Sequence, residues 1–213
     1  MKINKSSIKK SISLLKKCEC VGIPTETVYG LAANAYSNKA VMKIFKLKKR
    51  PTNNPLIVHY YNLDSAKKDC QFNKIFLKFY RKLCPGPITF ILKLKEESLI
   101  SKKVTNNKNT IAIRFPSHPI SRYLLKKINF PLAAPSANIS TGISPVTKKD
   151  VKEEFGNKLK YVLDGGWSKL GLESTIIDLT HKPQVLRLGG LDIDTLNQYL
   201  KANICYNPKI NFN

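Results

Sequence analysis

The segment KLKKRPTNNPLIVH (residues 46–59) contains a helix end, a turn bounded by two prolines and an apolar strand in immediate succession. Three lysines and Arg50 gather at the helix end, Pro51 stops the helix, and Pro55 leads into apolar residues typical of a buried strand. The helix dipole accounts for lysines at a helix C-terminus, but not for Arg50 in the turn. Two interpretations follow: a solvated helix end, or a turn that presents cations to phosphate groups.

Helical and strand patterns alternate on both sides of this segment, without an internal repeat or a linker-like stretch. The predicted helices are a first one capped by Ser6 or Ser7 and ending near residue 17, then 38–48, a helical pair within 63–83, 118–128, 147–155 with Thr147 as the cap, and a last one that begins at Asp192 or Asp194. The predicted strands are 20–24, 55–60, 88–95, 110–115, a short one at the start of PLAAPSAN (131–138), 161–166, 174–180 and 184–190. This mixed order predicts a layered α/β fold with a mixed sheet.

Composition is that of an ordinary globular chain. The 213 residues are 42% hydrophobic and 24% charged, which suits one well-packed domain. No stretch approaches the roughly 20 apolar residues of a membrane helix, and the N-terminus lacks the apolar centre of a signal peptide. We therefore expect a soluble, cytoplasmic protein that does not associate with membranes.

The cysteines do not form a metal-binding or disulfide pattern. Their spacing contains no C-x-x-C pair and their number is odd, so we expect reduced thiols that mostly serve in packing. The set is Cys18, Cys20, Cys70, Cys84 and Cys205.

The net charge of +23 is compatible with a polyanionic partner such as RNA. It is equally compatible with a genome-wide composition bias, because lysine dominates the 37 basic residues and arginine contributes only five. The guanidinium fork binds carboxylate and phosphate bidentately, so in a lysine-rich chain the few arginines mark candidate sites. They are Arg50, Arg81, Arg114, Arg122 and Arg187.

Small and polar residues follow several predicted strands, where open α/β sheets usually bind ligands. These segments are PTETVYGL (24–31), KKRPTNNP (48–55), APSANISTGIS (134–144), GLESTI (171–176) and VLRLGG (185–190). Arg114 lies within the apolar strand IAIRFP, where burial requires either a structural ion pair or a ligand. The hydroxyls of PTETVYGL have a plain alternative too, as exposed groups of a strand-to-turn transition.

Standard nucleotide and metalloenzyme motifs are absent. The sequence has no G-x-x-x-x-G-K-[ST] and no G-x-G-x-x-G. The three histidines are dispersed, which argues against a paired-histidine zinc site and a catalytic triad.

The order of these segments closely resembles the YrdC-like family of threonylcarbamoyl-AMP synthases. The resemblance runs from about residue 8 to 202, and the two hallmarks K-x-R and S-x-N match Lys48-Lys49-Arg50 and Ser136-Ala137-Asn138. Lys49 stands where the family often has glycine. The resemblance implies the short, single-domain bacterial form over residues 1–213, with a tail at 203–213, and a twisted mixed sheet flanked by helices beside an open basic cavity.

The resemblance also implies a reaction and its residues. L-threonine, bicarbonate and ATP would condense to threonylcarbamoyl-AMP and pyrophosphate, for N6-threonylcarbamoyladenosine at position 37 of tRNA. Lys48 and Arg50 would be catalytic. Threonine would bind to Thr27, His59, Arg114, Ala134 and Ser174, and ATP to Arg50, Asn54, Thr110, Ser136, Asn138, Ser144 and Arg187.

Further expectations concern cofactors and partners. ATP is a substrate, Mg²⁺ would accompany it without protein side-chain ligands, and no other cofactor is expected. tRNA and a separate transferase complex are candidate partners. Some relatives act on carbamoyl phosphate within larger proteins.

Charge build-up on phosphate oxygens calls for positioned cations and amides rather than a covalent nucleophile. Lys48 and Arg50 should therefore be solvent-accessible. The alternative from another class is a noncatalytic RNA-binding protein, although the sequence lacks the aromatic strand motif of an RRM and the G-x-x-G loop of a KH domain.

Overall fold

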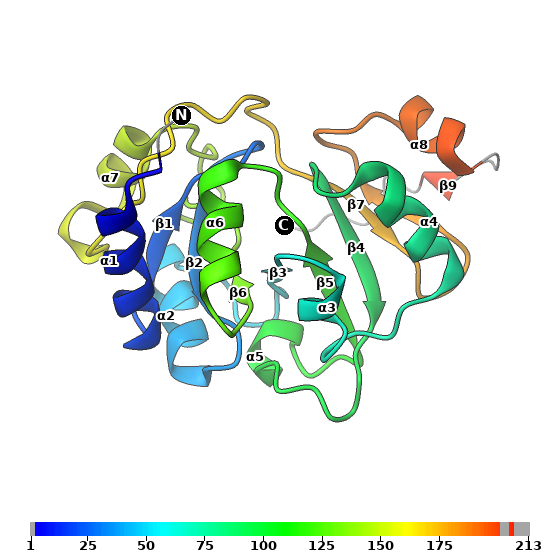
Figure 1. Cartoon of the computed structure of the whole chain (residues 1–213), viewed down its shortest axis with the longest axis horizontal. Coiled ribbons are helices and arrows are strands. Elements are labelled where there is room, and N and C mark those ends of the chain that lie inside the picture. Colours follow the sequence, from blue (N-terminus) through cyan, green and yellow to red (C-terminus); the bar gives the residue numbers. More distant parts are fainter. Residues whose placement is uncertain (1–2, 201–204, 207–213) are drawn as a thin grey trace.

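Nine strands and eight α-helices form the fold in a computed structural model that describes residues 3–200 and 205–206 (Figure 1). The helices are α1 (Lys5–Lys16), α2 (Asn38–Lys48), α3 (Leu63–Ala66), α4 (Lys74–Leu83), α5 (Lys102–Thr105), α6 (Pro119–Lys127), α7 (Lys148–Phe155) and α8 (Ile193–Leu200). The strands are β1 (Val21–Ile23), β2 (Gly30–Asn34), β3 (Ile57–His59), β4 (Ile88–Lys93), β5 (Thr110–Arg114), β6 (Leu132–Ala133), β7 (Thr175–Asp178), β8 (Gln184–Arg187) and β9 (Cys205–Tyr206).

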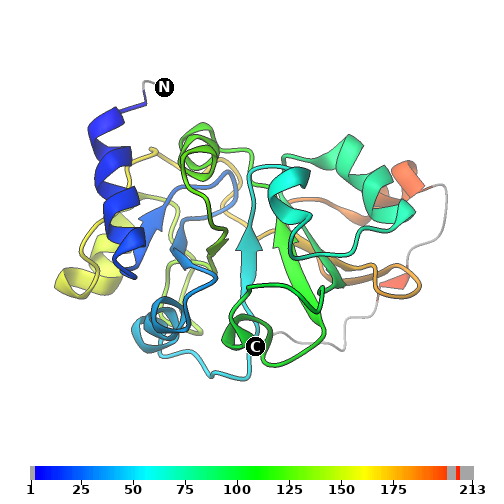
Figure 2. The same cartoon turned by 60° about the horizontal axis from the view of Figure 1, so that its bottom comes forward.

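All nine strands join in one mixed sheet with the order β1-β2-β6-β3-β5-β4-β7-β8-β9. The pairs β3/β5, β4/β7 and β8/β9 are parallel, and the other neighbours are antiparallel. Helices α1 and α7 lie at the β1 end of the sheet, and α4 and α8 at the β7 end (Figures 1 and 2). The layered α/β fold with a mixed sheet is therefore confirmed.

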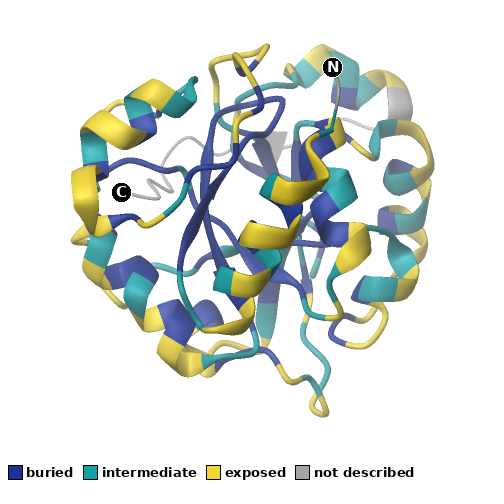
Figure 3. Cartoon of the chain, turned by 60° about the vertical axis from the view of Figure 1, so that its left-hand side comes forward, coloured by how far each residue is buried: buried dark blue, intermediate teal, exposed yellow. Residues whose placement is uncertain are grey.

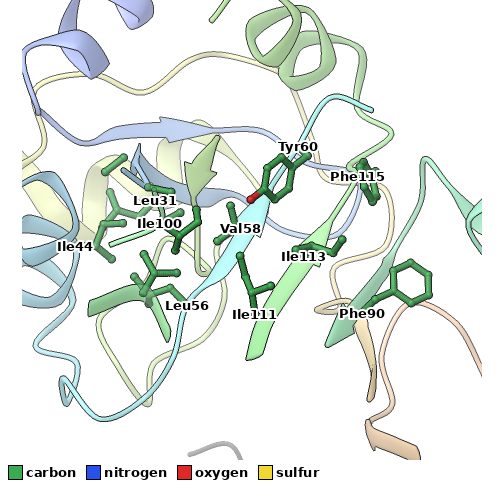
Figure 4. Packing of buried hydrophobic residues seen from close by; sticks show 14 of the residues in the cluster. Leu31, Ile44, Leu56, Val58, Tyr60, Phe90, Ile100, Ile111, Ile113 and Phe115 are labelled. Carbon is green, nitrogen blue, oxygen red and sulfur yellow. The ribbon is translucent and has the colours of Figure 1, made fainter. Parts of the chain in front are cut away.

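The middle of the sheet has one fully covered face. Along β5, Ile111 and Ile113 are buried, whereas Thr110 and Ala112 are partly exposed. Because side chains alternate across a strand, Ile111 and Ile113 point to the same face. Figure 4 shows them among the other side chains of the main core, and the strands appear largely buried behind helices with exposed outer sides in Figure 3. On the opposite face, the side chains of Thr110 and Ala112 remain partly exposed.

Helix ends follow the capping residues of the sequence. Thr147 and Asp150 form a capping box at the start of α7, and Asp192 accepts from Thr195 N at 2.7 Å at the start of α8, as predicted. The predicted cap of the first helix is wrong, because Asn4 rather than Ser6 or Ser7 accepts from Ser7 N at 3.1 Å.

Two predictions of strands need correction. The predicted strand 161–166 makes only one isolated bridge, between Val162 and Gly22, and the backbone leaves the extended conformation at Gly166, which has a φ of 71°. Conversely, GLAAN forms β2 although no strand is predicted there. Its small side chains lack strand propensity, and burial between β1 and β6 holds them in the strand. Helix α5 likewise forms between the predicted strands 88–95 and 110–115, where no helix is predicted.

The described cysteine side chains are free thiols: Cys18, Cys20, Cys70 and Cys84. Among the residues described, none of the helices combines the length and apolar character required to cross a bilayer. Of the tail predicted at 203–213, the structure describes only Cys205–Tyr206, and the rest lies outside the described residues.

Candidate functional site

A large cavity of about 530 Å³ opens on the face of the sheet away from the main core. Its apolar floor comes from four adjacent central strands: Ile57 on β3, Ala112 on β5, Ile91 on β4 and Ile176 on β7. Its walls come from polar segments far apart in the sequence. The seven residues expected at ATP all line it, as does Lys48, which was predicted to be catalytic: Arg50, Asn54, Thr110, Ser136, Asn138, Ser144 and Arg187.

A small cavity of about 70 Å³ adjoins the large one. The five residues expected at the amino acid all line it: Thr27, His59, Arg114, Ala134 and Ser174. Arg50, Ser136, Glu173 and Arg187 belong to the walls of both cavities, which therefore share a junction. The structure thus brings the residues predicted at ATP and at threonine into one continuous site, whereas the candidate arginines Arg81 and Arg122 line neither cavity.

Backbone pairing explains how PTETVYGL reaches the S-x-N loop more than a hundred residues later. Leu31 N donates to Pro135 O and Ala137 N donates to Tyr29 O, both at 2.8 Å. Tyr29 N also donates to Pro145 O at 2.8 Å. These bonds continue the contact between β2 and β6, so the two segments form adjacent walls of the site.

Lys48 is buried, contrary to the expectation of solvent access. Its side chain is 1% exposed, and Nζ donates to Ser136 O at 2.6 Å and to Asn138 O at 2.5 Å. Burial, together with the positive charge of the nearby Arg50, lowers the pKa of Lys48 to about 8. Lys48 therefore holds the S-x-N loop in place at the end of α2, rather than extending freely into the cavity.

Asn138 supports the same loop. Its side-chain amide donates to Ile139 O at 2.8 Å and to Gly142 O at 2.7 Å. Lys48 O also accepts from Ser140 N at 2.8 Å. The K-x-R turn and the S-x-N loop are thus a single hydrogen-bonded unit at one wall of the large cavity.

Lys49 ends α2 with a φ of 49°, in the left-handed region that favours glycine. This conformation explains why glycine suits the middle position of the K-x-R motif. Lysine adopts it here at a cost of about 1 kcal/mol.

Arg50 organises the turn that follows. It is half-buried, and Nη2 donates to Asn54 Oδ1 at 2.5 Å and to Pro55 O at 3.1 Å. The proline-bounded turn therefore folds around the guanidinium group and fixes its position at the junction.

Arg114 has a structural ion pair and also an unused polar group. It is 5% exposed, and Nη2 lies 2.9 Å from Glu26 Oε1 without the alignment of a hydrogen bond. Glu26 Oε2 accepts from Ser117 N at 3.0 Å. Arg114 Nε has no hydrogen-bond partner within residues 3–200, so the ion pair leaves part of the fork available to a ligand.

His59 lies beside Arg114 in the sheet, since the two residues pair between β3 and β5. It is 2% exposed, and Nδ1 lacks a hydrogen-bond partner in the described part of the chain. Burial and the charge of Arg114 hold the pKa of His59 well below its usual value. The imidazole is therefore neutral at physiological pH, with one nitrogen as donor and the other as acceptor.

Arg187 and Glu173 form an ion pair at the junction. Arg187 Nη2 also donates to Ser174 O at 2.8 Å, and Glu173 Oε1 accepts from Ser144 Oγ at 3.3 Å. The Ser174 hydroxyl lies 2.7 Å from the hydroxyl of Thr89. These contacts connect β8, the start of β7 and the loop after the S-x-N motif.

Two carboxylates were not assigned a role from the sequence. Glu26 and Glu173 appear in the quoted segments PTETVYGL and GLESTI, directly beside Thr27 and Ser174. Only their positions next to predicted site residues could have indicated, from the sequence, that they belong to the site. The charge balance that reveals them, Glu26 facing Arg114 and Glu173 facing Arg187, appears only in the folded chain.

The described side chains contain no group of three or more metal-ligand types arranged to hold a metal ion. The large cavity instead combines cations and hydrogen-bonding groups with an apolar floor. Such a surface suits a ligand with both an anionic and an apolar part.

Comparison with known proteins agrees with this geometry. The Sua5/YciO/YrdC family model, described as "Telomere recombination", matches residues 13–189. The threonylcarbamoyl-AMP synthase of Pyrococcus abyssi is 37% identical over 93% of this chain and 58% of its own length. That of Histophilus somni (strain 129Pt) is 37% identical over 81% of this chain and 94% of its own length.

A solved structure shows the same fold. The crystal structure of P. abyssi Sua5 complexed with L-threonine has a TM-score of 0.93 and 35% identity, over 98% of this chain and 61% of that chain. The chain spans about half the length of several curated relatives, with 53–58% of each covered. The family match and the identity over most of this chain show that it belongs to the Sua5/YciO/YrdC family.

Proposed function

We propose that this chain is an L-threonylcarbamoyladenylate synthase, which condenses L-threonine, bicarbonate and ATP to threonylcarbamoyl-AMP and pyrophosphate. The observation that carries the proposal is the pair of adjoining cavities that share Arg50, Ser136 and Arg187. Relatives named threonylcarbamoyl-AMP synthase and a Sua5 structure complexed with L-threonine support it.

The small cavity suits the amino acid. Arg114 Nε and His59 Nδ1 are buried groups without hydrogen-bond partners in the described chain, and both residues line this cavity. A substrate carboxylate would satisfy the arginine fork, and the threonine hydroxyl would bond to the neutral imidazole or to Ser174. A site with buried polar groups rejects amino acids that leave these groups unpaired.

The large cavity suits the nucleotide. Arg50 and Arg187 at the junction would bind phosphate oxygens, with Ser136 and Ser144 as further donors. The adenosine would lie over the apolar floor formed by Ile57, Ile91 and Ala112. Lys48 would act from behind the S-x-N loop, by holding it and by adding positive charge.

The chemistry follows from this arrangement. The threonine amine and bicarbonate give a carbamate and water; a carbamate oxygen then attacks the α-phosphorus of ATP, and pyrophosphate leaves with the electron pair of the broken P–O bond. Two arginines at the junction would stabilise the charge that develops there, without a covalent enzyme intermediate. Mg²⁺ would arrive with the nucleotide and neutralise phosphate charge, held by phosphate oxygens.

The product would supply the threonylcarbamoyl group for position 37 of tRNA. A separate transferase complex would carry out that transfer, and the cytoplasm is the compartment in which both steps would take place. Direct tRNA binding by this chain would rely on its strongly basic surface, given the net charge of +23.

An assay with single omissions tests the proposed function. The purified chain is incubated with ATP, Mg²⁺, L-threonine and bicarbonate, and pyrophosphate and threonylcarbamoyl-AMP are measured by coupled assay and mass spectrometry. We expect both products only when all substrates are present. No product, together with tight and salt-sensitive tRNA binding, would contradict the synthase and favour an RNA-binding protein.

A further inference from the structure

Glu173 occupies a distinctive position in the site. It lines both the large and the small cavity, and it is the only carboxylate among the described residues that line the small one. It lies two residues before the start of β7, and its side chain is 35% exposed. A carboxylate at this junction would face both substrates of the proposed reaction.

The surroundings of Glu173 are cationic. Arg187 pairs with it directly, and the charges of Lys48 and Arg50 also act on it across the junction. All three cations are suited to the phosphates of a nucleotide. When ATP binds, its phosphates would compete for Arg187 and Ser144, which now contact Glu173, and the carboxylate would become available to another cation.

The orientation of the amino acid identifies that cation. Arg114 and His59 pair side by side at the ends of β3 and β5, on the wall of the small cavity that does not border the large one. A threonine carboxylate on Arg114 leaves the amino group facing the junction. The carbamate must form at that nitrogen within reach of the α-phosphate, so the ammonium group has to lie near Glu173.

We propose that Glu173 binds the ammonium group of the amino acid and accepts a proton from it before the carbamate forms. The ammonium group and the carboxylate become an amine and a carboxylic acid. The amine nitrogen then attacks the carbon of bicarbonate, the C–N bond forms, and water leaves to give the carbamate. The proton on Glu173 passes to solvent, to which the side chain is exposed.

This inference rests on the proposed function, because it names the group that recognises and activates the amino acid in that reaction. It also explains the ion pair with Arg187. Two arginines and a lysine close together repel one another in the absence of a nucleotide, and one carboxylate reduces that repulsion.

A substrate analogue without the amino group separates ammonium recognition from other roles. The analogue is 2,3-dihydroxybutyrate, in which a hydroxyl replaces the amine of threonine. Calorimetry gives the Kd of each compound in the presence of a non-hydrolysable ATP analogue. We expect wild-type protein to bind threonine at least about tenfold more tightly than the analogue, because a charge-assisted bond is lost.

The variant Glu173→Gln keeps the size of the side chain and removes its charge. We expect its preference for threonine over the analogue to fall to about twofold or less, and kcat to fall by about 100-fold as the base is lost. Binding of the ATP analogue should not weaken, since Arg187 keeps its charge. Glu173→Asp, which retains a carboxylate, should preserve the preference, and Glu153→Gln on the outer side of α7 is the matched control outside both cavities.

Thermal unfolding of each variant verifies that it is folded. A Glu173→Gln protein that keeps the wild-type preference for threonine would overturn the inference. If wild-type protein makes no product from threonine, bicarbonate and ATP, the proposed function fails, whereas the comparison of the two Kd values still decides whether Glu173 recognises the ammonium group.

Discussion

Arg114 lies within an apolar strand, where Glu26 at 2.9 Å compensates its buried charge. Both side chains are nearly inaccessible, so removal of one partner would leave an isolated buried charge and cost about 3–5 kcal/mol. The pair alone does not satisfy the guanidinium group, since Nε remains without a partner in the described chain. Arg114 is thus held in position by a structural contact and still available to a carboxylate.

Arg114→Lys tests that second role. Lysine retains a positive charge near Glu26 but loses the planar fork. We expect the KM for threonine to rise by about 10- to 100-fold, equivalent to one charge-assisted hydrogen bond of roughly 1.5–3 kcal/mol, while the KM for ATP changes little. Steady-state kinetics measures both constants. Arg122→Lys is the matched control, because Arg122 stacks over the Tyr61 ring outside both cavities; an unchanged threonine KM in Arg114→Lys would contradict the assignment.

Because Lys48 is buried rather than solvent-accessible, its substitution should lower stability as well as activity. Lys48→Met removes the donor for Ser136 O and Asn138 O and leaves both carbonyl groups without this partner. We expect the free energy of unfolding to fall by about 1–3 kcal/mol and synthesis to be lost. Urea denaturation and the product assay measure these effects. Lys46→Met, at an exposed position of the same helix, should change the free energy of unfolding by no more than about 0.5 kcal/mol. Equal stability of the two variants would contradict the conclusion that buried Lys48 holds the S-x-N loop in place.

The pKa of about 8 for Lys48 predicts proton uptake on nucleotide binding. At pH 8 about half of the side chains are neutral in the free protein. Phosphates nearby favour the charged form and raise this pKa, so binding draws a proton from solution. Calorimetry of ATP-analogue binding at pH 8, in buffers with different enthalpies of ionisation, should show this uptake in wild-type protein. Uptake of the same size in Lys48→Met would assign it to another group.

At the scale of elements, the central sheet separates packing from binding. Val58, Ile111 and Ile113 belong to the main core on one face (Figure 4), whereas Ile57 and Ala112 form the floor of the large cavity on the other. Because side chains alternate between the two faces of a strand, β3 and β5 each contribute to the core and to the cavity. The polar residues come from the segments that leave these strands or lie beside them.

Close backbone packing positions the end of β8 against the start of β7. A Cβ on Gly189 would lie 2.1 Å from Glu173 O, too close for any side chain. We expect Gly189→Ala to lower the free energy of unfolding by about 1–3 kcal/mol and to raise the KM for threonine, since Glu173 and Ser174 must shift. Gly30→Ala is the stability control, because its Cβ would lie 3.5 Å or more from its neighbours. Equal unfolding free energies for the two variants would contradict this account of the junction.

At the scale of the whole molecule, local patterns predicted most of the elements but not the contacts between them. The helix 38–48, the turn after it and the strand beginning near Pro55 follow from caps, prolines and apolar runs. The strand at GLAAN was missed because its small side chains carry no strand pattern and tertiary burial decides its conformation. The segment 161–166 has a strand pattern, but Gly166 turns the backbone away.

The site shows the same limit. Strand-end position pointed to segments that line the two cavities, whereas the scarcity of arginine pointed to Arg81 and Arg122 as well as to the three arginines that line them. Lys48 is buried by a segment about ninety residues away in the sequence, and Glu173 pairs with Arg187, which lies fourteen residues away. No local sequence pattern encodes either contact. The sequence resemblance identified which residues meet, and the folded chain shows how they are held.

The central claim is that the large cavity holds the nucleotide and the small cavity holds the amino acid beside it. A crystal structure of the chain with a non-hydrolysable ATP analogue and L-threonine measures this most directly. We predict phosphate oxygens within hydrogen-bond distance of Arg50 and Arg187, and the threonine carboxylate on Arg114 with its nitrogen at the junction. Electron density for either ligand outside these two cavities, with the cavities themselves empty, would contradict the account.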